Sequence, residues 1–98
     1  MNYSLHPEAE ADLRDASEFY RERADKTLAQ SFLAEFEQSL TILLRHPGLG
    51  SSWKGHGRRR YLMKRFPYSL IYTISDQEIR ILAVAHHSRR PGYWLGRK

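Results

Sequence analysis

Hydrophobic and polar positions in the first half of the chain predict one short strand followed by two helices. Residues 3–6 alternate between apolar and polar side chains, as expected of a strand. Over residues 7–23 apolar side chains recur every three or four positions, and Pro7 suits a first helical turn, so we expect an amphipathic helix. After a polar break, a second and longer helical pattern runs to His46-Pro47-Gly48, where Pro and Gly oppose continuation. The short connection predicts an antiparallel helical hairpin.

The second half of the chain predicts a loop and three further strands. Residues 49–58 are rich in Gly and Ser and are expected to form the loop. Segments of strand-like alternation, separated by short turns, then cover residues 60–66, 68–75 and 79–86. Residues 91–97 are expected to form either a short last helix or a tail.

These elements predict a single α+β domain over residues 1–98. Strands joined by such short turns must be antiparallel, and the helical hairpin can then cover one face of the sheet. The expected layout is a two-layer βααβββ fold with its second sheet face open. Because an unpaired Arg is costly to bury, we expect Arg80 and His86 to lie together on that open face.

Composition narrows the class of protein. At 98 residues, with 41% hydrophobic and 28% charged residues, the chain is typical of one soluble globular domain. It has no Cys, which excludes disulfides and thiolate metal sites. No apolar run is long enough to span a membrane, and no secretion signal is recognisable. We therefore expect a cytoplasmic protein that needs no cofactor and does not bind membranes.

The net charge of +5 is distributed unevenly. Residues 1–26 carry four basic and seven acidic side chains, whereas residues 53–98 carry eleven basic and two acidic ones. A field divided in this way attracts a polyanion or an acidic protein. The alternative is that these charges only keep the surface soluble.

Several motifs, in order along the chain, resemble the RelE/ParE superfamily of toxins from type II toxin–antitoxin systems. The resemblance covers essentially the full length and is carried by the following segments: Glu10-Ala11-x-Leu13, His46-Pro47-Gly48-x-Gly50, the Arg-rich strand before Phe66-Pro67-Tyr68, Leu70-Ile71-Tyr72, Ile81-Leu82-Ala83-Val84-x-His86 and Arg90-Pro91-x-Tyr93-Trp94-x-x-Arg97. The resemblance implies the same βααβββ layout that the periodicity predicts.

Members of this superfamily act by two different mechanisms. RelE-like members cleave mRNA on the ribosome, and ParE-like members poison DNA gyrase. In RelE-like enzymes an Arg stands at the position of Ser69, and a basic loop pair is reduced here to Lys54. The chain is therefore closer to ParE-like members, which implies a non-enzymatic, growth-arresting toxin that binds gyrase and forms a hetero-oligomer with its cognate antitoxin. The target-binding surface is expected to comprise Arg89, Arg90, Tyr93, Trp94 and Arg97.

Two other functions stay open. The first is a metal-independent, ribosome-associated endoribonuclease that acts on mRNA, whose catalytic groups would be His86, His87, Arg89 and Tyr93. The second is a non-toxic module that only binds its antitoxin.

The candidate residues also have simpler structural interpretations. His86 and His87 suit a general acid/base pair, or are surface side chains bonded to the next loop. Tyr93 and Trp94 suit either a binding anchor or a docked tail. A basic patch that contacts phosphate or an acidic partner is expected from Arg58, Arg59, Arg60, Lys64, Arg65 and Arg80. Within the run 58–60, at least one Arg is expected instead to pair with a helix carboxylate such as Glu35 or Asp12.

The apolar stripe of the second helix is expected to be core, with a groove beside it for an antitoxin segment. The stripe comprises Leu28, Phe32, Phe36 and Leu40. No metal site is expected, because His46, His56, His86 and His87 lack the ligand spacing of zinc signatures.

Overall fold

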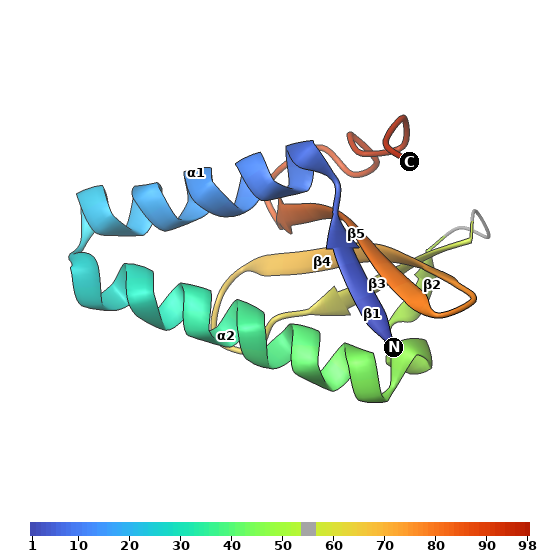
Figure 1. The fold of residues 1–98 in the computed structure, drawn as a ribbon. Helices are drawn as coiled ribbons and strands as arrows, with labels where there is room; N and C mark the ends of the chain where they lie inside the picture. The colour runs from blue at the N-terminus through green and yellow to red at the C-terminus, as the bar shows by residue number, and fades with distance from the viewer. Residues whose placement is uncertain (54–56) are drawn as a thin grey trace.

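A mixed five-stranded sheet and a helical hairpin make up the fold (Figure 1). The structure is a computed structural model that describes residues 1–53 and 57–98. The strand order is β1-β5-β4-β3-β2, with β1 parallel to β5 and every other pair antiparallel. The strands are β1 Asn2–Leu5, β2 Ser51–Trp53, β3 Arg58–Leu62, β4 Tyr68–Ser75 and β5 Glu78–His86.

Both helices form where the apolar periodicity predicts them. Helix α1 spans Pro7–Arg23 and helix α2 spans Lys26–Arg45. The side chains of His6 and Asp25 accept hydrogen bonds of 3.0 and 2.8 Å from first-turn backbone N–H groups, which a helix otherwise leaves unpaired. No helix in the described part of the chain is both long and apolar enough to cross a membrane.

The predicted two-layer α+β class is confirmed, with two refinements. First, β1 joins the sheet at its edge in parallel with β5, so only the other four strands form the expected antiparallel sheet. Second, the expected loop at residues 49–58 includes regular structure. The 3₁₀ turn η1 (Pro47–Leu49) overlaps the start of this range at Leu49, and the short strand β2 lies within it. Three residues are too few to show a period of two, so pairing with β3 is what makes β2 a strand.

The main core lies between the hairpin and the sheet. The predicted stripe of α2 is confirmed as core, since Phe32, Phe36 and Leu40 are buried and Leu28 is partly buried. The ring of Phe32 packs 5.1 Å from that of Tyr68, which faces the helices from β4. Burial of such side chains is the main stabilising contribution to the fold.

A buried tyrosine explains the Gly-containing segment after α2. The Tyr72 hydroxyl donates a hydrogen bond to the Pro47 carbonyl (2.7 Å) and accepts one from the Gly50 N–H (2.9 Å). A Cβ atom at Gly50 would lie 2.6 Å from that hydroxyl. The close approach therefore requires glycine at this position.

A β-bulge in β5 overturns one expectation about the sheet faces. Ile81 pairs with Tyr72 and Ala83 with Ile71, so Leu82 is an extra residue in the ladder. Beyond the bulge the alternation is shifted, and His86 pairs with Tyr68, which faces the helices. The prediction that His86 shares the open face with Arg80 is therefore wrong.

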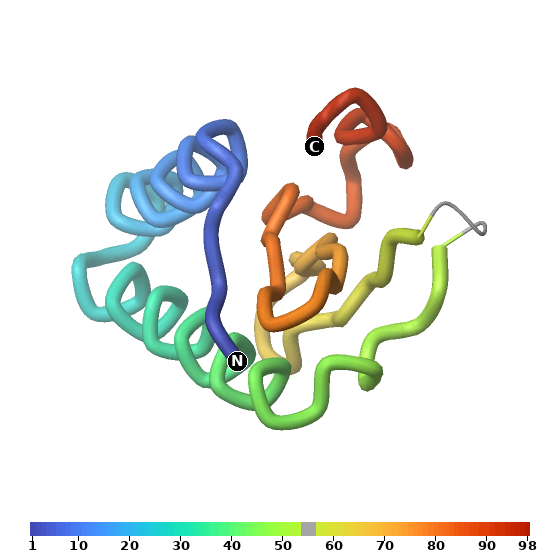
Figure 2. Tube along the Cα trace, turned by 45° about the vertical axis from the view of Figure 1, so that its right-hand side comes forward, coloured from blue at the N-terminus to red at the C-terminus, as the bar shows by residue number. Residues whose placement is uncertain are grey.

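The second face of the sheet is not open, because the chain after β5 folds back over it. Trp94 is 4% exposed and packs with Ile71, Leu82 and the neighbouring alanines of β5. Its ring lies 5.4 Å from that of Trp53. Residues 91–97 form successive turns rather than a short helix, and Figure 2 shows this segment beside the sheet. The tail interpretation of residues 91–97 is therefore the correct one.

Candidate functional site

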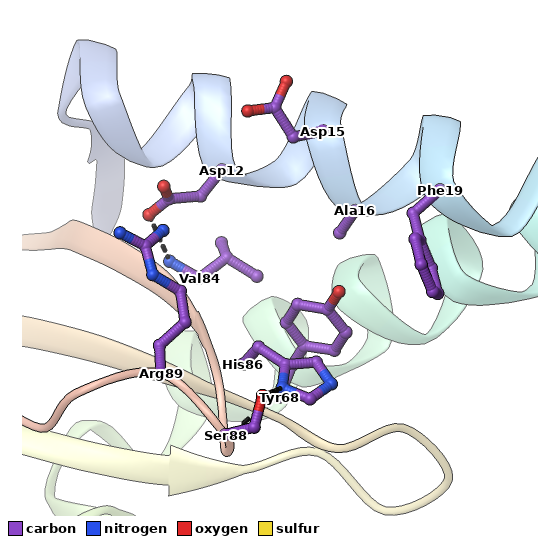
Figure 3. A pocket seen from close by; sticks show the side chains of 9 residues that line it. All are labelled: Asp12, Asp15, Ala16, Phe19, Tyr68, Val84, His86, Ser88 and Arg89. Atoms are coloured by element: carbon purple, nitrogen blue, oxygen red, sulfur yellow. Dashed lines mark hydrogen bonds between the residues drawn. The ribbon is translucent and has the colours of Figure 1, made fainter.

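A cavity of about 430 Å³ lies between α1 and the end of β5 (Figure 3). Helix α1 supplies one wall, and β4, β5 and the following turn supply the other. Apolar and charged side chains are mixed in the lining, which comprises Asp12, Asp15, Ala16, Phe19, Tyr68, Val84, His86, Ser88 and Arg89. Two of the predicted site residues, His86 and Arg89, therefore meet in one cavity.

The His86 ring is held in place from two sides. Its Nδ1 atom accepts a hydrogen bond from the Ser88 N–H (3.0 Å) and lies 2.7 Å from the Ser88 Oγ. The Tyr68 ring stands edge-on to it at a centroid distance of 4.9 Å. The accepting Nδ1 leaves the proton of the neutral ring on Nε2. His86 thus closes the turn after β5 in addition to lining the cavity.

Asp12 ties the tail to the free edge of β5. Strand β1 pairs with residues 78–81, and no strand in the described part of the chain pairs with the next part of this β5 edge. The Oδ2 atom of Asp12 accepts hydrogen bonds from the Val84 N–H (3.2 Å) and from Arg97 Nη1 (2.7 Å). Arg97 Nη1 also donates to the Leu82 carbonyl (3.0 Å). The pair therefore satisfies edge groups that would otherwise be open to another strand.

Tyr93 belongs to the same cluster. Its hydroxyl donates to Asp12 Oδ2 (3.3 Å), and the guanidinium carbon of Arg89 lies 3.8 Å from its ring centroid. Burial, followed by the charge of Asp12, raises the pKa of Tyr93 to about 12. Burial alone would lower the pKa of Arg97, but the hydrogen bond and the charge of Asp12 outweigh it and raise that pKa. Both groups keep their protons at neutral pH.

The five predicted target-binding residues therefore divide into two groups. Arg89 and Arg90 are exposed on the turn after β5. Trp94 is buried, and Tyr93 and Arg97 are engaged with Asp12. Two of the five are thus exposed on the turn after β5, and the other three hold the tail that follows this turn.

His86 and His87 engage different partners. The His87 Nε2 atom lies 2.9 Å from the Ser69 Oγ, and Ser69 points to the tail-covered face. The His86 ring instead packs on Tyr68, which points toward the helices. The two imidazoles therefore contact different side chains, although both line a small cavity on the tail-covered side of the sheet.

The six residues of the expected basic patch are not brought together. Arg59 donates to the Gly50 carbonyl (2.7 Å) on the helix side, and Arg65 pairs with Glu35 (3.0 Å). Arg58, Arg60 and Arg80 extend from the other face, while Lys64 is exposed in the turn after β3.

The predicted pairing of an Arg in the 58–60 run with a helix carboxylate is wrong, because Glu35 binds Arg65 and Asp12 binds Arg97. Arg58 instead donates to the Leu95 carbonyl at 3.0 Å. That contact fastens the tail to the sheet. Arg58 and Arg59 thus donate to main-chain carbonyls, where pairing with a helix carboxylate was expected.

Sequence reasoning named Asp12 only as a possible partner of an Arg and did not consider Phe19, although both line the cavity. Asp12 lies three residues after Ala9 and four before Ala16, so a carboxylate interrupts the apolar stripe of α1. Phe19 is 48% exposed although it is aromatic. Two features of the sequence could have indicated these residues: Asp12 is a charged side chain within the apolar stripe of α1, and Phe19 is an aromatic side chain next to that stripe.

Metal binding finds no support in the described residues, among which no group of three His, Cys, Asp or Glu side chains could hold an ion. Lys54 of the basic loop and His56 of the zinc alternative lie outside the described residues.

Comparison with known proteins identifies the family. A family model described as the ParE toxin of the parDE type II toxin–antitoxin system matches residues 3–91. No curated protein sequence matches the chain. A solved structure described as a chromosomal ParDE toxin–antitoxin system from P. aeruginosa is 22% identical, with a TM-score of 0.78 over 88% of this chain and 95% of that one. At this identity the likeness shows the shared fold. The match of the family model over most of the sequence shows that the chain belongs to the ParE toxin family of type II toxin–antitoxin systems.

Proposed function

We propose that the chain is a growth-arresting toxin that poisons DNA gyrase in the cytoplasm and is neutralised by a cognate antitoxin in a hetero-oligomer. The observation that carries this proposal is the match of the ParE family model to residues 3–91. The target follows from the mode of action of ParE-like toxins, which the sequence resembles more closely than it resembles RelE-like enzymes.

The geometry supports a binding function more than a catalytic one. The Tyr93 hydroxyl donates a hydrogen bond to Asp12, and its pKa of about 12 makes it a poor acid near neutrality. His86 and His87 contact different side chains, Tyr68 and Ser69. Arg89 and Arg90 are instead exposed on a turn that the docked tail supports. A rigidly presented pair of cations suits recognition of an acidic protein surface.

We place an antitoxin segment in the cavity beside α1. Its apolar lining from Ala16, Phe19 and Val84 suits one side of an amphipathic segment, and Arg89 suits an acidic residue next to it. The groove expected beside the stripe of α2 is less suitable, because Phe32, Phe36 and Leu40 are buried in the core. Phe19→Asp is expected to weaken antitoxin binding and leave toxicity in place, because it removes apolar contact area from the cavity.

The target is tested by inducing the toxin without its antitoxin and pulse-labelling new DNA and new protein. Gyrase poisoning predicts an early loss of DNA synthesis with a DNA-damage response. Purified protein added to gyrase and supercoiled plasmid should also accumulate cleaved DNA. An early loss of protein synthesis with cleaved mRNA would support the ribonuclease alternative, and no arrest would support the non-toxic module.

The surface is tested with a charge-reversed pair and a matched control. Arg89→Glu with Arg90→Glu should abolish growth arrest, because it removes the exposed cations of the turn. Arg21→Glu with Arg45→Glu makes the same change of charge at exposed helix positions and should leave toxicity intact. Equal loss in both pairs, at equal expression, would show that only net charge matters.

A further inference from the structure

Strand β1 forms one edge of the sheet, and its outer side is open. The strand order places β1 beside β5 alone, and Figures 1 and 2 show it at the front with no other described segment before it. Asn2 and Tyr3 are exposed, and Ser4 and Leu5 are partly buried. An edge strand offers a row of unpaired main-chain groups to any strand that can pair with it. Another chain can therefore extend the sheet at β1.

The ladder to β5 shows which main-chain groups of β1 face outward. The N–H groups of Asn2 and His6 donate to carbonyls on the β5 side, at 2.7 and 2.9 Å. A parallel ladder uses every second residue of a strand, so Ser4 also faces β5. The N–H and C=O groups of Tyr3 and Leu5 consequently point away from the sheet. None of these groups bonds to another segment of the described chain.

The neighbouring part of this edge is protected, whereas β1 is not. Beyond the end of β1, Asp12 and Arg97 form hydrogen bonds with the outward groups of β5. Other edge strands are guarded by a Lys, a Pro or a bulge. The segment Asn2–Leu5 contains neither Lys nor Pro, and its pairing with β5 runs in register. The edge is thus closed to strand addition next to the cavity and open at β1.

The open edge is complementary to a second copy of itself. Two β1 strands can run antiparallel with their Ser4 residues opposite each other across a twofold axis. Tyr3 of each copy then stands opposite Leu5 of the other copy. Because the outward groups belong to these two residues, each Tyr3 exchanges both of its main-chain hydrogen bonds with Leu5 of the second copy. This register satisfies every outward N–H and C=O group of Tyr3 and Leu5.

The side chains suit the same pairing. Tyr3 lies beside the buried Ile79 of β5, so its ring is on the helix side of the sheet, where it is 49% exposed. Leu5 lies on that side too and packs against the core. The ring of Tyr3 therefore packs on Leu5 of the second copy, as aromatic and aliphatic cross-strand neighbours do. β1 carries no charged side chain, so two copies with a net charge of +5 can meet there without close repulsion.

We propose that the chain forms a symmetric homodimer through antiparallel pairing of two β1 strands. The two sheets become one continuous sheet, with both helical hairpins on the same side. A standard interface buries about 1,200–2,000 Å², and a strand of 4 residues by itself buries less. Monomer and dimer are therefore expected to exchange, and the dimer to prevail only at high concentration. The proposal goes beyond the toxin function and is independent of the toxin's target.

A single introduced cysteine tests the register directly, because the chain has no Cys. Opposite residues of a non-hydrogen-bonded antiparallel pair have Cα atoms about 4.5 Å apart, which is within disulfide reach. Ser4→Cys in the full chain should form a disulfide-linked dimer under mild oxidation, measured by non-reducing electrophoresis. Ser52→Cys, exposed on β2 at the opposite edge of the sheet, is the matched control and should stay monomeric. Equal cross-linking of both variants would contradict the proposed pairing.

Sedimentation velocity over a wide range of protein concentration, at constant ionic strength, tests the dimer without a cross-link. Tyr3→Lys should weaken dimerisation about tenfold, because it removes the ring contact from both halves of the interface and places a charge on the edge. Its thermal midpoint at low concentration should match that of the parent, since Tyr3 is half exposed. Leu33→Lys makes the same change of charge at an exposed apolar residue of α2 and should dimerise as the parent does.

The proposal is overturned if the parent stays monomeric at every concentration, or if the two Lys variants associate equally. A monomeric parent whose Tyr3→Lys variant loses antitoxin binding would assign this edge to an antitoxin strand and would overturn the proposal as well. Loss of the dimer with unchanged growth arrest would separate this interface from the toxin function.

Discussion

The two faces of the sheet are covered in different ways. On the helix side, long apolar and aromatic side chains from the hairpin and from strands β1, β3, β4 and β5 form one continuous core. On the tail side, a smaller cluster around Trp94 is held by polar contacts from Arg58 and Arg97. The helix-side face is thus covered mainly by apolar packing, and the tail-side face is covered by a short segment that hydrogen bonds from Arg58 and Arg97 hold in place.

This difference teaches where stability and recognition reside in the molecule. The helix side satisfies its charges internally, as Glu35 does with Arg65. On the tail side, Arg60 and the Trp94 N–H have no partner among the described residues, and Arg89 and Arg90 are exposed. Groups that remain unsatisfied at a cost in folding free energy are the ones expected to contact a ligand. Four substitutions test this contrast.

The largest effect is expected from Phe32→Ala on the helix side. Phe32 is fully buried against Tyr68 and Phe66, and its truncation leaves a cavity that the hairpin cannot fill. The free energy of unfolding should fall by about 4 kcal/mol, measured by urea denaturation. Leu33→Ala changes the exposed neighbour and should cost far less. Similar losses in both variants would contradict the proposed core.

Arg97→Gln should have the next largest effect, because it leaves the Asp12 carboxylate without its cation. Both side chains are only 10% exposed, and loss of one partner from such a pair costs about 3 kcal/mol. Hydrogen exchange at the Val84 amide should accelerate as the tail detaches, whereas the core of α2 should stay protected. Arg90→Gln is the exposed control. Unchanged exchange at Val84 would show that the tail does not protect this edge.

Tyr72→Phe tests the link between the sheet and the segment after α2. The change removes the hydroxyl that bonds Pro47 and Gly50, and so leaves a buried carbonyl and N–H unsatisfied. We expect a loss of about 2 kcal/mol in thermal or chemical unfolding. Tyr3→Phe, at an exposed position, should be neutral. A neutral Tyr72→Phe would mean that water replaces both bonds.

Glu35→Gln should have the smallest effect, and the effect should depend on pH. Burial would raise the pKa of Glu35, but hydrogen bonds from Arg65 outweigh it and lower the pKa from its ordinary value of 4.5. A lowered folded-state pKa means that the ionised carboxylate stabilises the fold above pH 4.5, and that this contribution is lost as pH falls through the folded-state pKa.

The expected cost of Glu35→Gln at neutral pH is about 1 kcal/mol, because Arg65 is largely exposed. Denaturation at pH 7 and at successively lower pH values measures the difference between the parent and the variant, with Glu37→Gln as the exposed control. A difference that stays constant down to pH 3 would contradict the ion pair.

The sequence by itself determined the helical hairpin, the strands β4 and β5, the core stripe of α2 and the family. These features depend on patterns that repeat over many residues, such as the apolar positions of α2 and the strand-like alternation of residues 68–75. Neighbouring residues largely decide such elements, because the period of the pattern equals the period of the helix or strand.

Tertiary structure alone decided the β-bulge, the docked tail and therefore the positions of the candidate site residues. One extra residue at Leu82 turned His86 toward the helices, and no local signal marks it. The contacts of Asp12 with Arg97, and of Ser69 with His87, join residues far apart in the chain. Such contacts depend on strand register and on how the tail packs. Periodicity carries no information about either one, so only the folded chain could show which cations remain free to bind.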